Sequence, residues 1–371
     1  MKVCMDIQAA LGQRAGVGRY VRELLAHLGP LAGADELAAF FFDFKRAGLE
    51  SPPAGVELRA CRWLPGRVAQ AAWKRIHFPP VDWFAGGADL YHFPNFIRPP
   101  LSRGKKSVVT IHDVSFLRLP ETTEERNLAW LSAEIQRTAD RADAILTDSR
   151  FSAREIVELL HVPEEKVFPV RLGLPPLAPP PEPGAAERMR RELGLEKPYL
   201  LAVGTIEPRK NIPFLVKIYE ALDGFDGDLV VAGGLGWKTE TSLRAMAESP
   251  RAAGIRRLHG LDDARLAALY DGAAAFVFPT LYEGFGFTPL EAMGRGVPVV
   301  AARNSSLPEV LGEAAAWVDG YDAHEWAAVV RGVLEDSGRS ADLRAAGAEQ
   351  ARKFTWEDTA RQTWEVYRRL V

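Results

Sequence analysis

Cysteine is almost missing from this chain, which has only Cys4 and Cys61 among its 371 residues. Two cysteines cannot build a disulfide framework or a zinc site, so the sequence predicts a protein of a reducing compartment. No stretch approaches the roughly 20 consecutive apolar residues that a membrane-spanning helix needs. The first residues, MKVCMDIQAA, become polar at Asp6, so no signal-peptide core is expected. Together these absences predict a cytoplasmic protein.

An excess of either charge is missing as well, because 46 basic and 49 acidic residues give a formal net charge of -3. A protein that binds nucleic acid non-specifically would carry a basic surplus, so no nucleic-acid partner is expected. The seven histidines form no closely spaced metal-ligand motif such as HExxH, so no metal site is predicted. At about 150 residues per domain, the length predicts two domains.

Short β-rich runs alternate with longer helical patterns, which is typical of βαβ units around parallel sheets. Helices are expected over 18–28 and 122–138, the second opening with Thr122 and Glu125 at capping-box spacing. Ser152 and Glu155 repeat that spacing before another helical stretch. In the first half, strands are expected at 2–7, 38–42, 56–60, 89–93, 107–111, 144–147 and 167–170.

A proline-rich segment, LPPLAPPPEPG, interrupts the alternation and can form neither a helix nor a central strand. Beyond it the alternation restarts with YLLAVGT, DLVVAGG, IRRLHG, AAFVFP and VPVVAA. The sequence therefore predicts an α/β protein with doubly wound, Rossmann-like domains over 1–173 and 198–355. A linker is expected over 174–197, and a C-terminal helix over 356–371 can pack back on the first domain.

The first strand is followed by a glycine-bearing loop that contains Gly12, Gly16 and Gly18. Glycines let backbone N–H groups approach an anion, and the next helix N-terminus adds a favourable partial charge. Val21 stands where the GxGxxG pattern has its third glycine, so a dinucleotide-dependent dehydrogenase is disfavoured. The loop by itself fits a phosphate or sugar contact and a plain tight turn equally well.

Two later loops also connect a strand to a helix. GTIEPRKN places Arg209 and Lys210 beyond a strand, at the edge where open α/β sheets bind ligands. Cations at a helix start oppose its dipole, which favours a functional role over a solvated surface. LYEGFGFTPLEAMG holds Glu283 in a turn and Glu291 in the helix that follows. Its exposed backbone amides suit a diphosphate, and a carboxylate beside them suits sugar hydroxyls.

Two further polar motifs lie next to predicted strands. His112 and Asp113 follow the strand SVVTI at its carboxyl end, where a histidine is more often functional than elsewhere. Asp226-Gly-Asp228 has the DxD form that holds a metal diphosphate in many single-domain glycosyltransferases. It precedes a strand here instead of following one, so a turn is the favoured interpretation.

Five segments taken together resemble a known family: GVGRY, TIHDVSF, VGTIEPRKN, HGLDDARLAALY and LYEGFGFTPLEAMGRGVPVV. They are similar to the retaining, two-domain (GT-B) glycosyltransferases of family 4, in the same order and over nearly the whole chain. The most specific element is the E-x7-E pattern of Glu283 and Glu291. The resemblance implies two Rossmann-like domains that face each other across a cleft, with the acceptor on the N-terminal side and the nucleotide sugar on the C-terminal side.

The resemblance also implies roles for single residues. The catalytic residues would be Glu283 at the donor sugar, His112 near the transferred sugar, and Arg209 and Lys210 on the diphosphate. Glu291 would contact the nucleotide ribose. The other donor-binding residues would be Gly16, Val17, Gly18, Glu207, Gly260, Tyr282, Gly284, Phe285, Gly286, Phe287 and Thr288.

The implied reaction is a metal-independent, retaining transfer of a hexose from a nucleotide diphosphate sugar to a hydroxyl of a glycan or lipid-linked acceptor. SLPEV and HDVSFLRLPE resemble stretches of mannosyltransferases of surface-polysaccharide assembly, so GDP-mannose is the first expected donor. No cofactor is expected besides this co-substrate. Two alternatives stay open: a nucleotide-sugar epimerase of the same architecture, and a protein that binds nucleotide sugars without turnover.

The segment from Arg62 to Phe78 is locally basic in a chain that is acidic overall. Its apolar residues after Pro65 recur at helical spacing between two tryptophans. Such a helix suits an anionic membrane surface, which would place the protein peripherally on the cytoplasmic face of the membrane. The alternative is an ordinary amphipathic helix packed on the first sheet with a solvated basic face, and the short, alanine-rich apolar stripe slightly favours this alternative.

Overall fold

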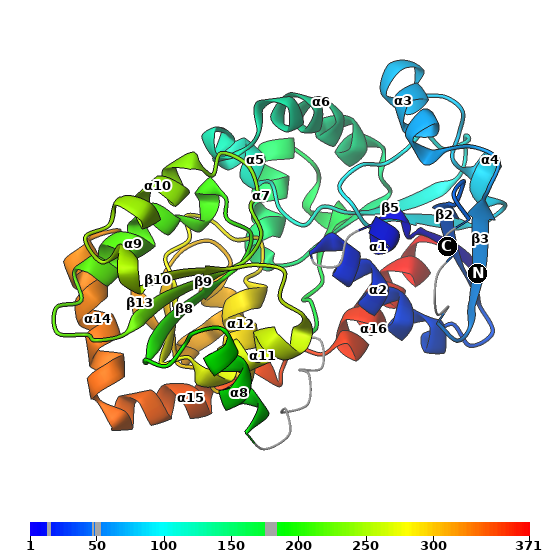
Figure 1. Ribbon diagram of the computed structural model, residues 1–371. Coiled ribbons are helices and arrows are strands. Elements are labelled where there is room, and N and C mark those ends of the chain that lie inside the picture. The colour runs from blue at the N-terminus through cyan, green and yellow to red at the C-terminus, as the bar shows by residue number, and fades with distance from the viewer. Residues whose placement is uncertain (13–15, 47, 49–52, 175–183) are drawn as a thin grey trace. The chain divides into compact units, whose positions relative to one another are not determined.

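The computed structural model describes residues 1–12, 16–46, 48, 53–174 and 184–371, and its helices and strands are drawn in Figure 1. The chain divides into two compact units. The first comprises Met1–Val114, Ala129–Gly173 and Thr355–Val371, and the second comprises Ser115–Leu128 and Leu174–Phe354.

A seven-stranded parallel sheet forms the centre of the first unit, in the order β3-β2-β1-β4-β5-β6-β7. Its strands are β1 (Lys2–Asp6), β2 (Glu36–Phe42), β3 (Val56–Cys61), β4 (Leu90–Phe93), β5 (Lys106–Thr110), β6 (Ala144–Thr147) and β7 (Val167–Pro169). The strand order reverses between β1 and β4, which are hydrogen-bonded neighbours. All the strands predicted for this half of the chain are thus present, with ends shifted slightly.

Helices cover both faces of this sheet, as the alternating sequence requires. They are α1 (Gln8–Gly12), α2 (Val17–Leu28), α3 (Gly66–Ile76), α4 (Asp82–Ala85), most of α6 (Glu125–Arg141), α7 (Arg150–Leu160) and α16 (Trp356–Leu370). The last of these, α16, packs beside α2 (Figure 1). Its Tyr367 hydroxyl lies 2.6 Å from Nδ1 of the fully buried His92, and its Trp356 ring contacts Tyr20.

The second unit is built on a six-stranded parallel sheet in the order β10-β9-β8-β11-β12-β13. Its strands are β8 (Tyr199–Val203), β9 (Asp228–Ala232), β10 (Ile255–Leu258), β11 (Ala275–Phe278), β12 (Val299–Ala302) and β13 (Ala315–Val318). The first five were predicted. β13 was not, because half of its residues are alanine, which has a low strand propensity.

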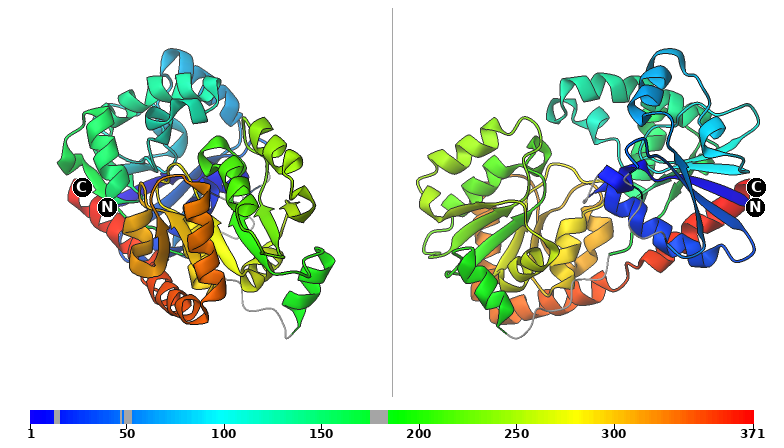
Figure 2. Two further views of the ribbon diagram at one scale, coloured as in Figure 1. Left: turned by 90° about the vertical axis from the view of Figure 1, so that its left-hand side faces the viewer. Right: turned by 45° about the vertical axis from the view of Figure 1, so that its right-hand side comes forward.

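Helices flank this second sheet as well, as two further views show (Figure 2). They are α8 (Ala185–Glu192), α9 (Ile212–Glu220), α10 (Glu240–Glu248), α11 (Asp263–Gly272), α12 (Phe287–Gly294), α13 (Leu307–Leu311), α14 (Ala323–Glu335) and α15 (Ser337–Ala351). The short helix α5 (Ser115–Arg118) belongs to this unit as well. A buried core, which includes Trp326 and Tyr219, lies between the sheet and α9, α10 and α14.

The structure corrects the predicted linker and the two predicted capping residues, Thr122 and Ser152. The linker was predicted over 174–197, but α8 lies inside that range and packs on α11; residues 175–183 lie outside the described part. Thr122 is not a cap, because its hydroxyl donates to the carbonyl of Leu119 and α6 begins only at Glu125. Ser149, not Ser152, caps α7, since its side chain accepts the Ser152 N–H.

Candidate active site

Two loops of the second unit meet where strands β8 and β11 end. These strands are hydrogen-bonded neighbours, and the strand order of the sheet reverses between them. Ligands of open α/β sheets bind at such a reversal, beyond the carboxyl ends of the strands. The loop after β8 carries Arg209 and Lys210 in a short 3-10 turn, and the loop after β11 carries Glu283.

Four charged side chains form a compact cluster at this point. Lys210 Nζ donates a hydrogen bond to Glu283 Oε1 at 2.6 Å, and Arg209 Nη1 lies 3.0 Å from Glu283 Oε2. Arg209 also donates to Glu207 Oε1 at 2.7 Å and to the carbonyl of Tyr282 at 2.7 Å. We call Glu207, Arg209, Lys210 and Glu283 the cation–carboxylate cluster. The sequence predicted its members, and the fold brings them into contact.

The electrostatics of the cluster keep Glu283 ionised. Its side chain is buried, and burial by itself would raise the pKa of the carboxyl group. The charges of Arg209 and Lys210 and their hydrogen bonds outweigh this effect and lower the pKa of Glu283 to about 2. Glu283 is therefore a permanent anion near neutral pH, which can accept hydrogen bonds but cannot donate a proton.

Polar residues that the sequence reasoning missed hold the Glu283 turn in place. The Glu283 N–H donates to Ser305 Oγ at 2.9 Å, and Thr280 Oγ1 lies 3.0 Å from Glu283 Oε1. Ser306 Oγ lies 2.8 Å from the carbonyl of Glu283 and 2.9 Å from that of Phe285, either of which can accept its proton. The signal was the polar run Asn304 to Ser306 directly after buried β12, at the same sheet edge.

The turn from Gly284 to Thr288 leads into α12, whose N-terminal residues present backbone amides. Gly286 has φ +107°, and a Cβ there would lie 2.7 Å from Leu307 Cδ2, so only glycine fits. Phe287 starts the helix, and Thr288 Oγ1 is buried with no hydrogen-bond partner among the described residues. An unpaired buried hydroxyl beside helix amides suits a bound polar ligand.

The other predicted residues of the second unit lie near this turn or on the adjoining strands. Glu291 is buried in α12 and accepts a hydrogen bond from the Tyr270 hydroxyl at 3.0 Å. Tyr282 and Phe285 are buried beside Glu283. Gly260 follows β10 in an exposed turn with φ +67°.

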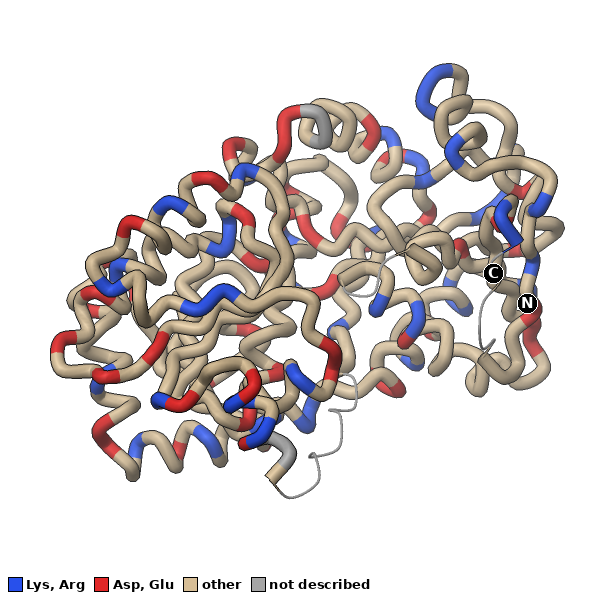
Figure 3. Tube along the Cα trace, viewed as in Figure 1, with Lys and Arg blue, Asp and Glu red and all other residues tan. Residues whose placement is uncertain are grey.

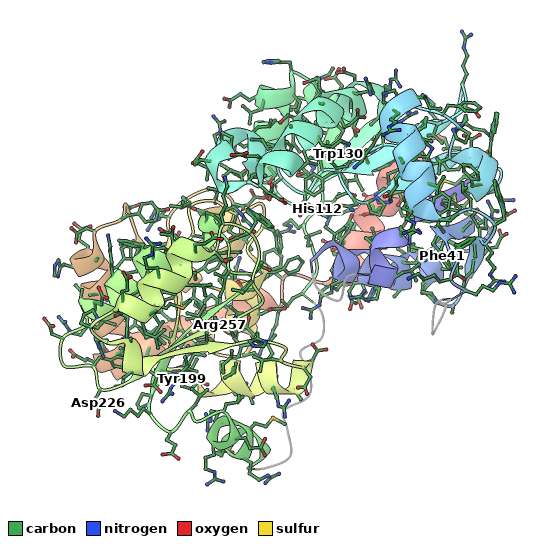
Figure 4. The ribbon with its side chains drawn as sticks, turned by 45° about the horizontal axis from the view of Figure 1, so that its top comes forward. Phe41, His112, Trp130, Tyr199, Asp226 and Arg257 are labelled. Atoms are coloured by element: carbon green, nitrogen blue, oxygen red, sulfur yellow. The ribbon has the colours of Figure 1, made fainter. Side chains whose placement is uncertain are left out.

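His112 lies in the first unit, just beyond β5 (Figure 4). Its Nδ1 lies 2.9 Å from Asp148 Oδ2, and its Nε2 lies 3.2 Å from the carbonyl oxygen of Pro94. Both partners accept hydrogen bonds, so the pair of contacts favours a doubly protonated ring. Burial opposes this charge, but Asp148 outweighs it and raises the pKa of His112. The sequence reasoning missed Asp148, which follows the neighbouring strand β6.

Gly16, Val17 and Gly18 also belong to the first unit. Gly16 caps α2 with φ +58°, and Val17 and Gly18 are its first residues. The loop before them, residues 13–15, lies outside the described part of the chain. In the described part of this loop, the predicted arrangement is present: a glycine, Gly16, directly precedes the N-terminus of α2.

The first unit also contains a pocket of about 620 Å³. Aromatic side chains of Trp73, Phe96 and Trp130 line it together with polar ones such as Asp6 and Glu134. Trp130, labelled in Figure 4, has a buried Nε1 without a hydrogen-bond partner among the described residues. Burial raises the pKa of the Asp6 carboxyl to about 6. Aromatic faces together with carboxylates suit a saccharide, whose rings have apolar faces and hydroxyl edges.

The DxD-like pair lies away from the cluster. Asp226 is exposed at the outer edge of the second unit and pairs with Lys197 at 2.6 Å, while Asp228 begins β9 (Figure 4). The backbone is irregular at Asp226 and forms a strand at Asp228, so the motif is not the turn that the sequence favoured. Among the described residues, no group of three or more His, Cys, Asp or Glu could hold a metal ion. In the same part of the chain, every helix is too short or too polar to cross a membrane.

Comparisons with known proteins identify the family. Residues 185–354 match the sequence family of glycosyl transferases group 1, and residues 14–176 match the sequence family of glycosyltransferase family 4. The chain is 30% identical to O-antigen chain mannosyltransferase B of Escherichia coli over 385 aligned positions that cover 100% of both chains. It is 29% identical over 303 positions to the serotype-specific mannosyltransferase WbdA of the same species, covering 78% of this chain and 36% of WbdA.

A solved structure extends the likeness to the fold. Sucrose-phosphate synthase from Thermosynechococcus elongatus superposes with a TM-score of 0.74 at 19% identity, covering 100% of this chain and 99% of that one. Its fold is the GT-B fold that the motifs implied, with two Rossmann-like domains. The sequence match over the full length identifies the chain as a glycosyltransferase. It therefore disfavours the two alternatives, a nucleotide-sugar epimerase and a binding protein without turnover. The chain belongs to the group 1 glycosyltransferases of family 4 and is a hexosyltransferase.

Proposed function

We propose that this hexosyltransferase transfers mannose, with retention and without a metal ion, from a nucleotide diphosphate sugar to a saccharide hydroxyl. The donor base we propose first is guanine, so that the donor is GDP-mannose. The two Escherichia coli relatives are both named as mannosyltransferases, and this supports the choice of sugar. The acceptor we propose is a glycan or a lipid-linked saccharide.

The cation–carboxylate cluster is the observation that carries this proposal. Arg209 and Lys210 lie at the carboxyl edge of the sheet and contact Glu283, whose turn leads into the start of α12. Two cations and a helix N-terminus stabilise the negative charge that develops on a leaving diphosphate, as a metal ion does in other enzymes. Glu283, held ionised by the same two cations, would accept hydrogen bonds from the hydroxyls of the donor sugar.

The cluster also bears on how retention is achieved. A double displacement needs a carboxylate free to attack the anomeric carbon, whereas both oxygens of Glu283 already contact cations. We therefore propose a front-face transfer. The bond between the anomeric carbon and the phosphate oxygen breaks, the acceptor oxygen bonds to the same face, and its proton passes to the departing phosphate. His112 would supply positive charge near the transferred sugar.

The two units would divide the substrates between them. We propose that the second unit binds the donor through Glu207, Gly260, Glu291 and the residues from Tyr282 to Thr288, and that Gly16 to Gly18 border its phosphates. The acceptor would enter the aromatic pocket of the first unit. We place the reaction in the cytoplasm, with support from Cys4 and Cys61, which are buried free thiols of the kind expected in a reducing compartment.

The test is to incubate the protein with GDP-, UDP-, ADP- and dTDP-sugars and to follow binding and slow hydrolysis by mass spectrometry. We expect GDP-mannose to bind and to be hydrolysed faster than the others. Arg209→Ala and Lys210→Ala should each weaken donor binding and lower kcat, while Lys217→Ala, an exposed cation on α9, should change neither. Preference for another sugar nucleotide would overturn the donor, and unchanged kinetics in both cluster variants would overturn the site.

A further inference from the structure

The surface around α3 and α4 of the first unit exposes large apolar side chains. Trp63, Val68, Ile76, Phe78 and Trp83 are each between 48% and 70% exposed. They make up five of the eleven large apolar side chains that are exposed in the described part of the chain. We call these five residues the α3–α4 surface. So many exposed apolar groups in one short stretch of chain indicate a docking surface.

The helix α3 packs on the sheet only in part: its Trp73 ring contacts Phe42 of β2, with 5.9 Å between the ring centroids. Ala69 is its one buried residue, while Val68 and Ile76, which the sequence pattern would place in a core, face solvent. The aromatic rings beside it contact one another: Phe78 packs edge-on against Trp83, and Trp63 lies 5.5 Å from Phe84. Packing of α3 on the first sheet therefore accounts for Trp73 but not for the exposed Val68 and Ile76.

The charge of this surface selects one kind of partner. From Arg62 to Trp83 the chain has four Lys and Arg residues and one acidic residue, Asp82, although the whole chain has a net charge of -3 (Figure 3). Arg67 and Arg75 are exposed on α3 itself, and Arg62 is exposed beside Trp63. Tryptophans at headgroup level with cations around them suit an anionic lipid bilayer.

The same helix forms one wall of the aromatic pocket. Gln70, Trp73, Lys74 and His77 line the pocket, whereas the exposed residues Val68, Arg75 and Ile76 do not. Spacings of three and four residues put the first set on one face of the helix. A bilayer that touches the exposed face would therefore lie within one helix diameter, about 10 Å, of the pocket.

We propose that the α3–α4 surface docks on an anionic lipid bilayer and so presents the pocket to acceptors that are anchored in that bilayer. The use of the pocket rests on the proposed function; the docking does not. A surface of this kind needs no membrane-spanning segment, since shallow insertion of aromatic rings and attraction of cations to anionic headgroups act together. The affinity for vesicles should therefore depend on both the apolar and the cationic residues.

Co-sedimentation with vesicles tests the docking without donor or acceptor. The wild-type protein should bind vesicles of phosphatidylglycerol mixed with phosphatidylcholine, bind less at high salt, and not bind phosphatidylcholine alone. The pair Arg67→Glu with Arg75→Glu should lower binding about 25-fold or more, because each cation near an anionic bilayer contributes roughly fivefold. Trp63→Ser with Trp83→Ser should lower it as well. All these residues are exposed, so folding should be unaffected.

The matched control is Arg141→Glu with Arg154→Glu, which makes the same charge change at exposed positions of α6 and α7. It should bind vesicles like the wild type. A wild-type protein that stays in the supernatant at low salt, or variants that bind unchanged, would overturn the proposal. So would a dimer that the surface variants dissociate, since a second copy would then cover the surface. Loss of transfer with vesicle binding intact would instead overturn the proposed function alone.

Discussion

Glu283 shows what burial does to a single charged side chain. Its carboxylate is held by two cations, a hydroxyl and the surrounding turn, and this offsets the cost of removing it from water. Because the pKa of Glu283 is lowered to about 2, its contribution to stability is complete above the unfolded value near 4.5 and is lost only as the pH falls through 2. Glu283 therefore stays ionised at any pH well above 2.

Replacing Glu283 by alanine should lower transfer by about 10²-fold or more, because its hydrogen bonds to the sugar matter most in the transition state. Binding of the free nucleotide should be preserved, since Arg209 and Lys210 remain. Steady-state kinetics and calorimetry with the nucleoside diphosphate measure the two effects. Glu335→Ala, at an exposed position of α14, is the control. Near wild-type transfer in a folded Glu283→Ala protein would contradict the assigned role.

Asp148 should control the protonation of His112. Its charge raises the pKa of His112 above the ordinary value near 6.5, so the protonated ring stabilises the fold below that value and this stability is lost as the pH rises through the raised pKa. If transfer needs the cation, kcat/KM should also fall on the alkaline side. Asp148→Asn should move this fall to lower pH, and pH–rate profiles measure it. Identical profiles for both proteins would contradict the prediction.

At the scale of elements, the position of α16 depends on how closely the backbone of Gly173 approaches the backbone at the start of this helix. A Cβ at Gly173 would lie 2.3 Å from the backbone nitrogen of Trp356, where α16 begins. Thr359 of α16 also donates to the carbonyl of Arg171 at 2.8 Å. The chain before the proline-rich segment thus contacts the first turn of the last helix, and both belong to the first unit.

Gly173→Ala should therefore destabilise the protein by roughly 1–3 kcal/mol, the usual cost of forcing extra atoms into a packed site. Gly87→Ala is the matched control, because a Cβ at Gly87 meets nothing within 4 Å. Urea denaturation followed by circular dichroism measures both. If the two variants unfold at the same urea concentration, α16 can move to accommodate the added methyl group without loss of stability, which would contradict the prediction.

At the scale of the whole molecule, each unit contains one parallel sheet and one set of polar residues at the carboxyl ends of its strands. In the second unit these are the cation–carboxylate cluster and the start of α12, and in the first they are His112 and Asp148. Parallel sheets bring such residues together because every strand ends at the same edge. The positive charges of Arg209 and Lys210 in the second unit determine what we expect of a metal ion in the reaction.

Transfer should be unaffected by a chelator, because Arg209 and Lys210 supply the positive charge that a metal ion would supply. The measurement is product formation with and without EDTA, followed by addition of Mg²⁺ or Mn²⁺. Activity that EDTA abolishes and a divalent ion restores would contradict this and direct attention back to Asp226 and Asp228. Variants of these two aspartates would then show whether their carboxylates hold the metal ion.

The sequence by itself determined the parallel sheets, the class of enzyme and most of the cluster. Strand and helix periodicities are local, and residues such as Arg209, Lys210 and Glu283 stand in loops whose spacing is typical of the family. Only the tertiary structure decided which distant residues touch: Ser305 with the Glu283 turn, Asp148 with His112, and Tyr367 with His92. It decided also that α3 exposes its apolar residues, because a helical pattern shows which side chains share a face but not what covers that face.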